Sequence, residues 1–559
     1  MTGAWTRGAK GLAILGLLAC AGCAGVKVSS VSTQDYIAQR RGDVLTTGQL
    51  SASAREAMAV LGMNAQDCRK DRDACTRKLA TMEGLDSERR LATLSEVWLM
   101  EAVAAEKRRP ASDEESDQLL DAYLQTARAA YAYLFFTPRS PSDRAFEDRQ
   151  TQVRDYYNYA VQQAVTRLFE QYRGRPPQPG TKMTAGSWQV LGEMSDVKLP
   201  GGKQFPHELV PASTLTFRGL RSMYRRDGFG AELVAVTARR VNDADTFKTP
   251  YSETPFPAVT VIMSFPGKTL EQVMATRDAT LAAYDPYKRD TVDLAGARVP
   301  LAANFTSGYG LWLARSGFAT QALRNVLGKE EGIDAPHVYL LQPYDPDRRT
   351  VIMLHGLASS PEAWINVANE VLGDETLRQR YQIWQVYYPT NTPLALNNRD
   401  IREALRQTIG HFDPMGVAQA SRDTVVIGHS MGGVLSRLLV SSSGDVLWDA
   451  LRDHAGLDDA RLEEAHAEFD PVLSFQSFQG VTRAVFIAAP HRGTPFAENT
   501  LSRWLSNLIT LPAKVVRQFA KLNRLAEADG PSRSVASIRV ANGVDNLSEK
   551  DRFVQLTAL

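Results

Sequence analysis

The feature that most constrains this chain is the sequence Gly428-His429-Ser430-Met431-Gly432, which separates an apolar run from a helical segment. Thr424 to Ile427 before it is typical of a buried strand, and Val434 to Leu439 after it has apolar residues at helical spacing. A strand that turns directly into a helix leaves no space for side chains at the turn, so the two glycines are needed there. The pattern predicts a sharp turn that holds the serine in a strained backbone conformation and projects its hydroxyl above a sheet.

Short apolar runs alternate with helical segments through the last part of the chain. The expected strands are Val338–Leu341, Val351–Leu354, Ile383–Tyr388, Thr424–Ile427 and Ala484–Ala488. The expected helices between them include Ala363–Leu372 and Ile401–Ile409. This alternation indicates a mostly parallel sheet with helices on both faces.

The earlier part of the chain changes character at the run Arg173 to Gly180, which is rich in proline and glycine and cannot continue a helix. Before it, apolar residues recur three and four apart, as at Leu91 and Leu94. After it, β-branched runs such as Ala258 to Met263 indicate strands. We expect a helical module over residues 20–176, a β-rich section over 177–332 and an α/β domain, incomplete at its C-terminus, over 333–559. The β-rich section is either a separate domain or an extension of the last sheet.

Residues 1–19 are typical of a signal peptide, because Arg7 and Lys10 precede an apolar run that is too short to span a bilayer. The residues around Cys20 and Cys23 resemble the bacterial lipobox, with a small residue before each cysteine. We favour Cys20 as the lipidated residue, since Leu17 stands three positions before it, with Cys23 as the alternative. The resemblance implies a lipid-anchored envelope protein, facing the periplasm from the outer membrane because no Asp follows either cysteine. A plain secretory signal is the competing interpretation.

Cys68 and Cys75 are the other two cysteines, and an oxidising compartment would allow them to pair. On an unbroken helix they would lie roughly 10 Å apart, which is beyond disulfide reach. A bond therefore requires a break in the charged stretch between them. A disulfide and two free thiols both remain open.

A second glycine-containing loop, His355-Gly356-Leu357, ends the strand before it, where a hydrolase supplies one donor of its oxyanion hole. The backbone N–H groups of Leu357 and Met431 are the expected donors. His355 is not expected to be a catalytic base, because the base normally follows the nucleophile in the chain.

Together these segments resemble bacterial lipoprotein α/β-hydrolases related to lipases and to GPI-inositol-deacylase-like esterases. The motifs that carry the resemblance are Pro343-Tyr344-Asp345-Pro346, His355-Gly356-Leu357, Tyr387-Tyr388-Pro389-Thr390, Gly428-His429-Ser430-Met431-Gly432-Gly433 and Ala489-Pro490-His491-Arg492-Gly493-Thr494. The implied fold is an α/β hydrolase preceded by a helical module and a β-rich section. The implied activity is hydrolysis of fatty-acyl or lipid esters through an acyl-enzyme on Ser430.

A serine nucleophile needs a histidine base and an acid, expected in the order Ser, Asp or Glu, His. His454 and His466 lie in an acidic insertion that is typical of a solvated helical cap, which leaves His491 as a weak candidate base. Beyond it, Leu501 to Leu525 is apolar on one helical face, as a lid or a packed helix pair would be. We expect a C-terminally truncated sequence; the alternative is an inactive hydrolase-fold interaction lipoprotein.

Composition excludes several other classes. The 64 Lys and Arg residues balance the 63 Asp and Glu residues, so nothing suggests a nucleic-acid partner. No phosphate-binding loop, dinucleotide motif or metal-spaced cluster is present, so we expect neither cofactor nor metal. The aromatic residues Tyr131, Tyr133, Phe135, Phe136, Tyr156, Tyr157 and Tyr159 are expected to be core rather than a ligand surface. The helical module could bind an envelope protein.

Overall fold

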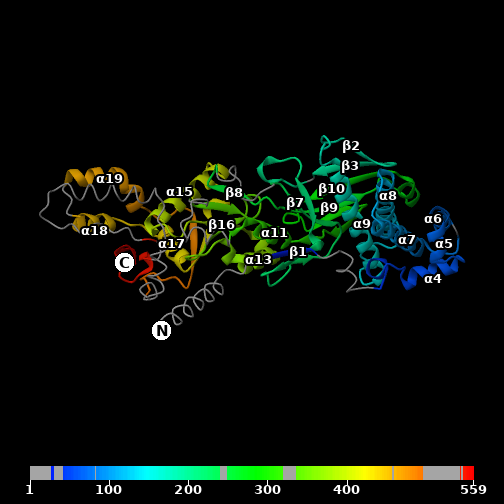
Figure 1. The fold of residues 1–559 in the computed structure, drawn as a ribbon, viewed down its shortest axis with the longest axis horizontal. Helices are drawn as coiled ribbons and strands as arrows, with labels where there is room; N and C mark the ends of the chain where they lie inside the picture. Colours follow the sequence, from blue (N-terminus) through cyan, green and yellow to red (C-terminus); the bar gives the residue numbers. More distant parts are fainter. Residues whose placement is uncertain are drawn as a thin grey trace, which may run out of the picture.

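The computed structural model describes residues 27–30, 42–81, 83–194, 196–238, 248–318, 335–455, 459–494, 542 and 545–558. Along the long axis of the molecule, helices occupy one end, a first sheet the middle and a second sheet with flanking helices the other end (Figure 1). The cysteines Cys20 and Cys23 and the segment Leu501 to Leu525 lie outside the described residues. No helix in the described ranges has the length and apolarity that a membrane crossing requires.

Three long helices form the body of the N-terminal module: α7 (Ser87–Arg108), α8 (Asp113–Phe135) and α9 (Asp148–Tyr172). Asp86 and Ser112 start α7 and α8, because the side-chain oxygen of each accepts a hydrogen bond from an N–H of the first turn. The shorter helices before them are α3 (Val44–Thr47), α4 (Ala52–Val60), α5 (Ala65–Lys70) and α6 (Arg72–Thr81). The helical N-terminal region expected from the sequence is therefore confirmed.

Cys68 in α5 and Cys75 in α6 form a disulfide, with their Cα atoms 4.9 Å apart. The bond is possible because α5 ends at Lys70 and Asp71 adopts an extended conformation before α6 begins. Of the two alternatives that the sequence left open, the structure has the disulfide.

The middle of the molecule is a six-stranded sheet in the order β2-β3-β10-β9-β7-β4. Its strands are β2 (Lys182–Ala185), β3 (Trp188–Met194), β4 (Glu208–Pro211), β7 (Ala231–Val236), β9 (Ala258–Ser264) and β10 (Asp278–Tyr284). All neighbours are antiparallel except β3 and β10. The β-rich section is thus mainly a sheet of its own.

One apolar core joins this sheet to the helical module. The tyrosines expected in the core are buried there: Tyr131, Tyr133, Tyr156, Tyr157 and Tyr159. The Tyr157 hydroxyl donates to the carbonyl oxygen of Met263 (2.5 Å) and accepts from its N–H (3.0 Å), which fastens α9 to β9. The helical module and the β-rich section therefore fold around shared apolar contacts.

Smaller elements lie beside the middle sheet or between it and the second sheet. They are β1 (Lys27–Ser30), β5 (Leu215–Arg218), β6 (Arg225–Arg226), β8 (Tyr251–Glu253), α10 (Leu270–Ala275), β11 (Thr291–Leu294), β12 (Ala297–Pro300), β13 (Ala303–Asn304) and α11 (Ser307–Ser316). β1 pairs with β5, and β6 pairs with β13. β8 leaves this section and joins the second sheet, so the β-rich section is both a separate sheet and an extension of the next one.

The second sheet has the order β8-β14-β16-β15-β17-β18. Its later strands are β14 (His337–Leu340), β15 (Arg349–Leu354), β16 (Tyr381–Tyr387), β17 (Thr424–His429) and β18 (Val481–Ile487). All pairs are parallel except β14 with β16. β18 is the last strand in the described part of the chain, and its residues Val485, Phe486 and Ile487 are exposed.

Helices cover both faces of the second sheet. On one face, α11 and α13 (Ile365–Gly373) bury alternate residues such as Met353. On the other, α15 (Leu394–Phe412) and α17 (Met431–Leu439) bury the residues between, such as Ile352. The remaining elements are η3 (Pro361–Trp364), α14 (Glu375–Arg380), α16 (Gln419–Arg422), α18 (Val446–Ala455), α19 (Asp459–Leu473), η5 (Asp545–Leu547) and α22 (Arg552–Thr557). The mostly parallel, two-faced sheet expected from the sequence is confirmed.

A buried carboxyl group ties α4 to α7 in the helical module. Glu96 accepts hydrogen bonds from the backbone N–H (2.6 Å) and hydroxyl (2.7 Å) of Ser51, the residue that starts α4. Burial, with a smaller contribution from nearby Asp43, raises the pKa of Glu96 to about 7, although the hydrogen bonds from Ser51 lower it. The folded module therefore binds a proton that the unfolded chain releases at lower pH.

We expect Glu96→Gln to remove part of the pH dependence of stability. Between the unfolded pKa of 4.5 and the folded value of about 7, the folded state binds more protons, so stability falls as pH rises, by about 3 kcal/mol across the window. The substituted glutamine can accept from the Ser51 N–H through Oε1 and donate to the Ser51 hydroxyl through Nε2, and it carries no charge. Circular dichroism melts at pH 5 and pH 8 should therefore show a smaller loss for Glu96→Gln than for wild type. Glu56→Gln, at an exposed site on α4, should behave as wild type; equal losses in all three chains would contradict the assignment.

Candidate active site around Ser430

Ser430 lies at a sharp turn between β17 and α17. Its backbone has φ 52° and ψ −121°, a region that residues with side chains rarely adopt. The turn is held by hydrogen bonds: Ser430 N–H donates to the Ile487 carbonyl (2.9 Å), and the N–H groups of Gly433 and Val434 donate to the Ser430 carbonyl (2.9 and 3.3 Å). The structure therefore places Ser430 at the carboxyl edge of the sheet in a strained conformation.

The two glycines on either side of Ser430 stand where no side chain fits. A Cβ on Gly428 would lie 2.2 Å from the Gly432 carbonyl oxygen, and a Cβ on Gly432 would lie 2.2 Å from the Leu354 carbonyl oxygen. Both obstacles are backbone atoms of packed elements, which cannot move aside as a flexible side chain could. The first turn of α17 thus lies directly against the end of β15.

The loop after β15 covers the serine. A Cβ on Gly356 would lie 3.2 Å from Ser430 Cβ and 3.1 Å from His429 Nδ1, so this loop touches the turn. Ala358 N–H donates to Thr390 Oγ1 (3.2 Å), which holds the far side of the loop. Among the described residues, no hydrogen bond occupies the backbone N–H of Leu357 or Met431. Two unpaired N–H groups are therefore available here, one at the start of α17 directly after Ser430 and one on the loop that touches the turn.

His355 is fully buried and supports this loop. Its Nε2 accepts from Tyr388 N–H (3.3 Å), so its Nδ1 carries the proton and donates to the Gly356 carbonyl (3.0 Å). The ring stacks on Tyr388 with centroids 4.4 Å apart, and the Tyr388 hydroxyl donates to the His355 carbonyl (2.5 Å). Burial lowers the pKa of His355 to about 4. Both ring nitrogens form hydrogen bonds, one with Gly356 and one with Tyr388, so His355 has a supporting role.

Tyr388 and Thr390 were not identified as supports of the loop from the sequence, although their motif is visible there.

His491 follows β18 on a loop that packs against α17. A Cβ on Gly433 in α17 would lie only 2.4 Å from the Cβ of Ala489 on this loop. The edge of its ring meets Phe486, with centroids 4.8 Å apart. Burial and the charge of Arg437 lower the pKa of His491. In the described part of the chain, its buried Nδ1 has no hydrogen-bond partner, and neither it nor any other histidine bonds to Ser430 Oγ.

The two other late histidines belong to the helix pair that extends from the end of the molecule (Figure 1). His466 stacks on Trp448, with centroids 3.7 Å apart, and its Nδ1 bonds to Asp470 Oδ1 (3.1 Å). His454 lies in α18, and its side chain is outside the described residues. His466 is therefore engaged inside the α18–α19 pair.

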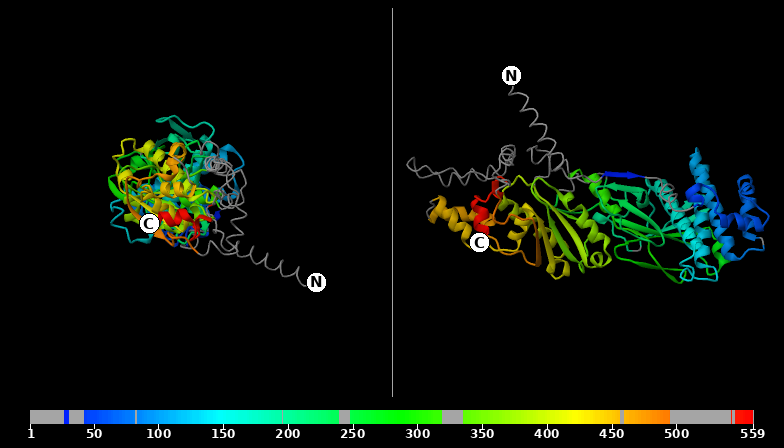
Figure 2. Two further views of the ribbon diagram at one scale, coloured as in Figure 1. Left: turned by 90° about the vertical axis from the view of Figure 1, so that its left-hand side faces the viewer. Right: turned by 90° about the horizontal axis from the view of Figure 1, so that it is seen from below.

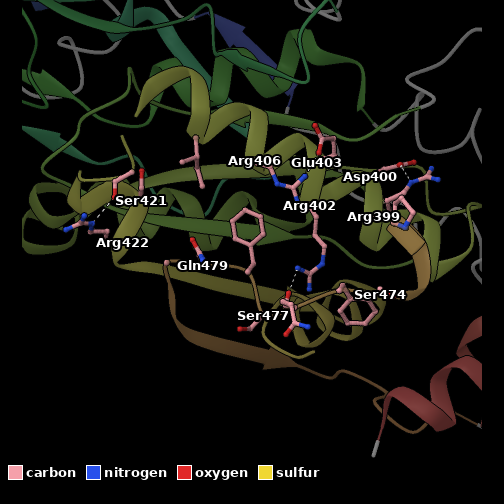
Figure 3. A pocket seen from close by; sticks show the side chains of 17 residues that line it. Arg399, Asp400, Arg402, Glu403, Arg406, Ser421, Arg422, Ser474, Ser477 and Gln479 are labelled. Carbon is pink, nitrogen blue, oxygen red and sulfur yellow. Dashed lines mark hydrogen bonds and ion pairs between the residues drawn. The ribbon is translucent and has the colours of Figure 1, made fainter. Parts of the chain in front are cut away.

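A groove of about 1220 Å³ lies on the outer side of α15, between that helix and residues 471–480 (Figure 3). Its most buried cation, Arg402, donates to the carbonyls of Leu438 and Gln476 and to Asn398 Oδ1. Neither Ser430 nor His491 lines this groove. Arg402 has a structural role here, and the groove is separate from the serine.

Within the described ranges, no group of three or more His, Cys, Asp or Glu residues is placed to hold a metal ion.

Residues 351–557 match the sequence model of the alpha/beta hydrolase family, so the C-terminal region holds an α/β-hydrolase domain. No curated protein matches the chain. Among solved structures, esterase B of Lactobacillus rhamnosis inhibited by a tributyrin phosphonate is 16% identical, with a TM-score of 0.20 over 37% of this chain and 66% of that one. Another structure of esterase B from this species is 18% identical, with a TM-score of 0.17 over 37% and 66%. The matched part of the chain thus spans slightly less than two thirds of the length of these esterases.

We expect Gly432→Ala to destabilise the hydrolase domain by several kcal/mol, on the order of a strongly overpacked core site, because its Cβ would overlap the Leu354 carbonyl. Gly410→Ala is the matched control: this glycine lies in α15 with nothing within 4 Å of its Cβ position, so alanine should stabilise the helix by up to about 1 kcal/mol. Thermal melts of both variants give the comparison. Equal melting temperatures would mean that α17 does not press on β15 as described.

Proposed function

We propose that this chain is a serine-dependent carboxylic-ester hydrolase of the esterase or lipase type, attached to the bacterial envelope by lipid on Cys20 or Cys23. The observation that carries the proposal is the backbone of Ser430, which stays at positive φ on a strand-to-helix turn covered by the Gly356 loop. Such strain costs about 1–3 kcal/mol and persists mainly at functional sites. Here it gives the hydroxyl a position from which it can attack a substrate above the sheet.

In the proposed reaction, Ser430 Oγ attacks the ester carbonyl carbon while a base takes its proton. The carbon–oxygen bond to the alcohol breaks, the base returns the proton to the leaving alcohol, and the acyl group stays on the serine. Water then attacks this acyl-enzyme, which releases the acid and restores Ser430. The N–H groups of Leu357 and Met431 would stabilise the negative charge on the carbonyl oxygen, at about 3 kcal/mol for one such donor.

His491 is the candidate base among the residues of this chain. We rank it third, after a catalytic histidine that is not assigned here and after an inactive hydrolase fold without a base. Its lowered pKa keeps the ring neutral at neutral pH, as a proton acceptor requires. Its loop reaches α17 through Ala489, close to the turn. No described carboxylate bonds to its ring, so the acid of the triad is unassigned.

The second candidate function is an inactive hydrolase-fold interaction lipoprotein whose helical module binds an envelope protein. One observation favours it: no histidine in the described ranges is hydrogen-bonded to Ser430 Oγ. A serine hydroxyl without a base is a poor nucleophile at neutral pH. Labelling of the serine separates the two functions.

A fluorophosphonate probe should label the wild-type chain and fail to label Ser430→Ala. Ser477→Ala, at an exposed serine of the same domain, should be labelled at the wild-type rate. If His491 is the base, His491→Gln should be labelled about 100-fold more slowly or worse, the usual effect of losing a general base. Equal labelling of wild type and Ser430→Ala would disprove the nucleophile. A wild-type chain that folds and is never labelled would support the inactive interaction protein.

A further inference from the structure

The position of β1 limits where a lipid anchor can hold the molecule. This inference rests on the anchoring part of the proposed function, with lipid on Cys20 or Cys23. Lys27, the first residue of β1, is seven residues after Cys20 and four after Cys23. Even a fully extended chain spans no more than about 25 Å over seven residues and about 14 Å over four. Lys27 must therefore stay within that distance of the bilayer surface.

β1 is itself bound midway along the molecule. It pairs antiparallel with β5, in a register that places Lys27 opposite Arg218 and Ser30 opposite Leu215. In the view from below, β1 lies at the margin of the molecule, between the hydrolase sheet and the middle sheet (Figure 2). The tether thus reaches the folded protein at the end of β5, where the loop of residues 218–224 begins.

This loop runs along α13, and its contacts show which end of the helix it comes from. Arg221 N–H donates to Asn366 Oδ1 (3.2 Å) at the second residue of α13, and Asn369 Nδ2 donates to the Ser222 carbonyl (2.8 Å). Further on, the Tyr224 ring packs against Gly373 at the last residue of the helix. The loop therefore runs from the N-terminal end of α13 toward its C-terminal end, and Arg218 precedes the residues that contact the N-terminal end.

The N-terminal end of α13 belongs to the edge of the sheet that carries Ser430. β15 and β17 are parallel, with Leu354 opposite Gly428, so both strands end at the same edge. The loop covering Ser430 and then α13 follow β15 from that edge. Tether attachment and candidate active site consequently share the carboxyl edge of the hydrolase sheet.

The surface beside the attachment point has the chemistry of a membrane contact. Arg218 and Arg221 are exposed and form no ion pair with any described residue. Met223 is 39% exposed and Val367, on α13, is 41% exposed. Arginines near an anionic leaflet contribute about 1 kcal/mol each, and apolar side chains between them can enter the headgroup region.

We propose that Arg218, Arg221, Met223 and Val367, here called the tether patch, rest on the anionic bilayer to which the chain is attached. The carboxyl edge of the hydrolase sheet then faces the same bilayer. The substrate of Ser430 would accordingly be an acyl ester within that leaflet, reached from its surface.

Energy transfer from a fluorophore to acceptors on the lipid headgroups tests this orientation without any turnover. The label is placed at Met223→Cys in the patch or at Met415→Cys, a more exposed methionine that precedes α16 and β17 at the opposite edge. The two edges are separated by the six residues of β17, about 20 Å. The full-length lipidated chain is bound to vesicles of phosphatidylethanolamine and phosphatidylglycerol, and the unsubstituted chain gives the background.

We expect severalfold stronger transfer from position 223 than from position 415, and a weaker signal at 223 when Arg218→Glu and Arg221→Glu are added. Equal transfer from both positions, or stronger transfer from 415, would overturn the orientation. An unchanged signal in the double glutamate variant would overturn the anionic contact. A chain that does not float with vesicles lacks the anchor, which overturns this inference and the anchoring proposal together. Failure of fluorophosphonate labelling alongside the expected transfer would remove the esterase and leave the orientation intact.

Discussion

The contact between Gly432 and the carbonyl end of β15 determines the geometry of the hydrolase domain. It brings the first turn of α17 against Leu354, which is possible only because no Cβ stands between them. With α17 fixed there, the chain must leave β17 in a single sharp turn, and Ser430 takes a positive φ as a result. The strain at the serine is thus a consequence of close packing between a helix and a neighbouring strand.

The loops at the carboxyl edge depend on the same arrangement. Three parallel strands, β15, β16 and β17, end side by side, so the segments that follow them meet above the sheet. His355 and Tyr388 fill the space between two of these loops, and both ring nitrogens and the backbone carbonyl of His355 have hydrogen-bond partners. A satisfied polar network in a buried position keeps the Gly356 loop in one conformation over Ser430.

The three parts of the molecule are joined by strands and cores that cross their boundaries. β8 comes from the middle section and pairs with β14, while the middle sheet shares apolar contacts with the long helices. β1, near the start of the chain, is paired to β5. An anchor at the N-terminus would therefore act on the middle of an elongated molecule and on the edge that carries the serine.

Local sequence determined much of this protein. The helical region to Tyr172, the five strands from β14 to β18, the buried tyrosines and the glycine turn around Ser430 all follow from apolar spacing and from the conformational needs of glycine. The strand order did not follow, because β14 and β15 are neighbours in sequence yet β16 lies between them. The disulfide, the strand β8 in the second sheet and the pairing of β1 with β5 were also decided only by the tertiary structure. Periodicity reports which face of a segment is buried, whereas pairing between distant segments depends on which edges and surfaces the rest of the fold leaves available.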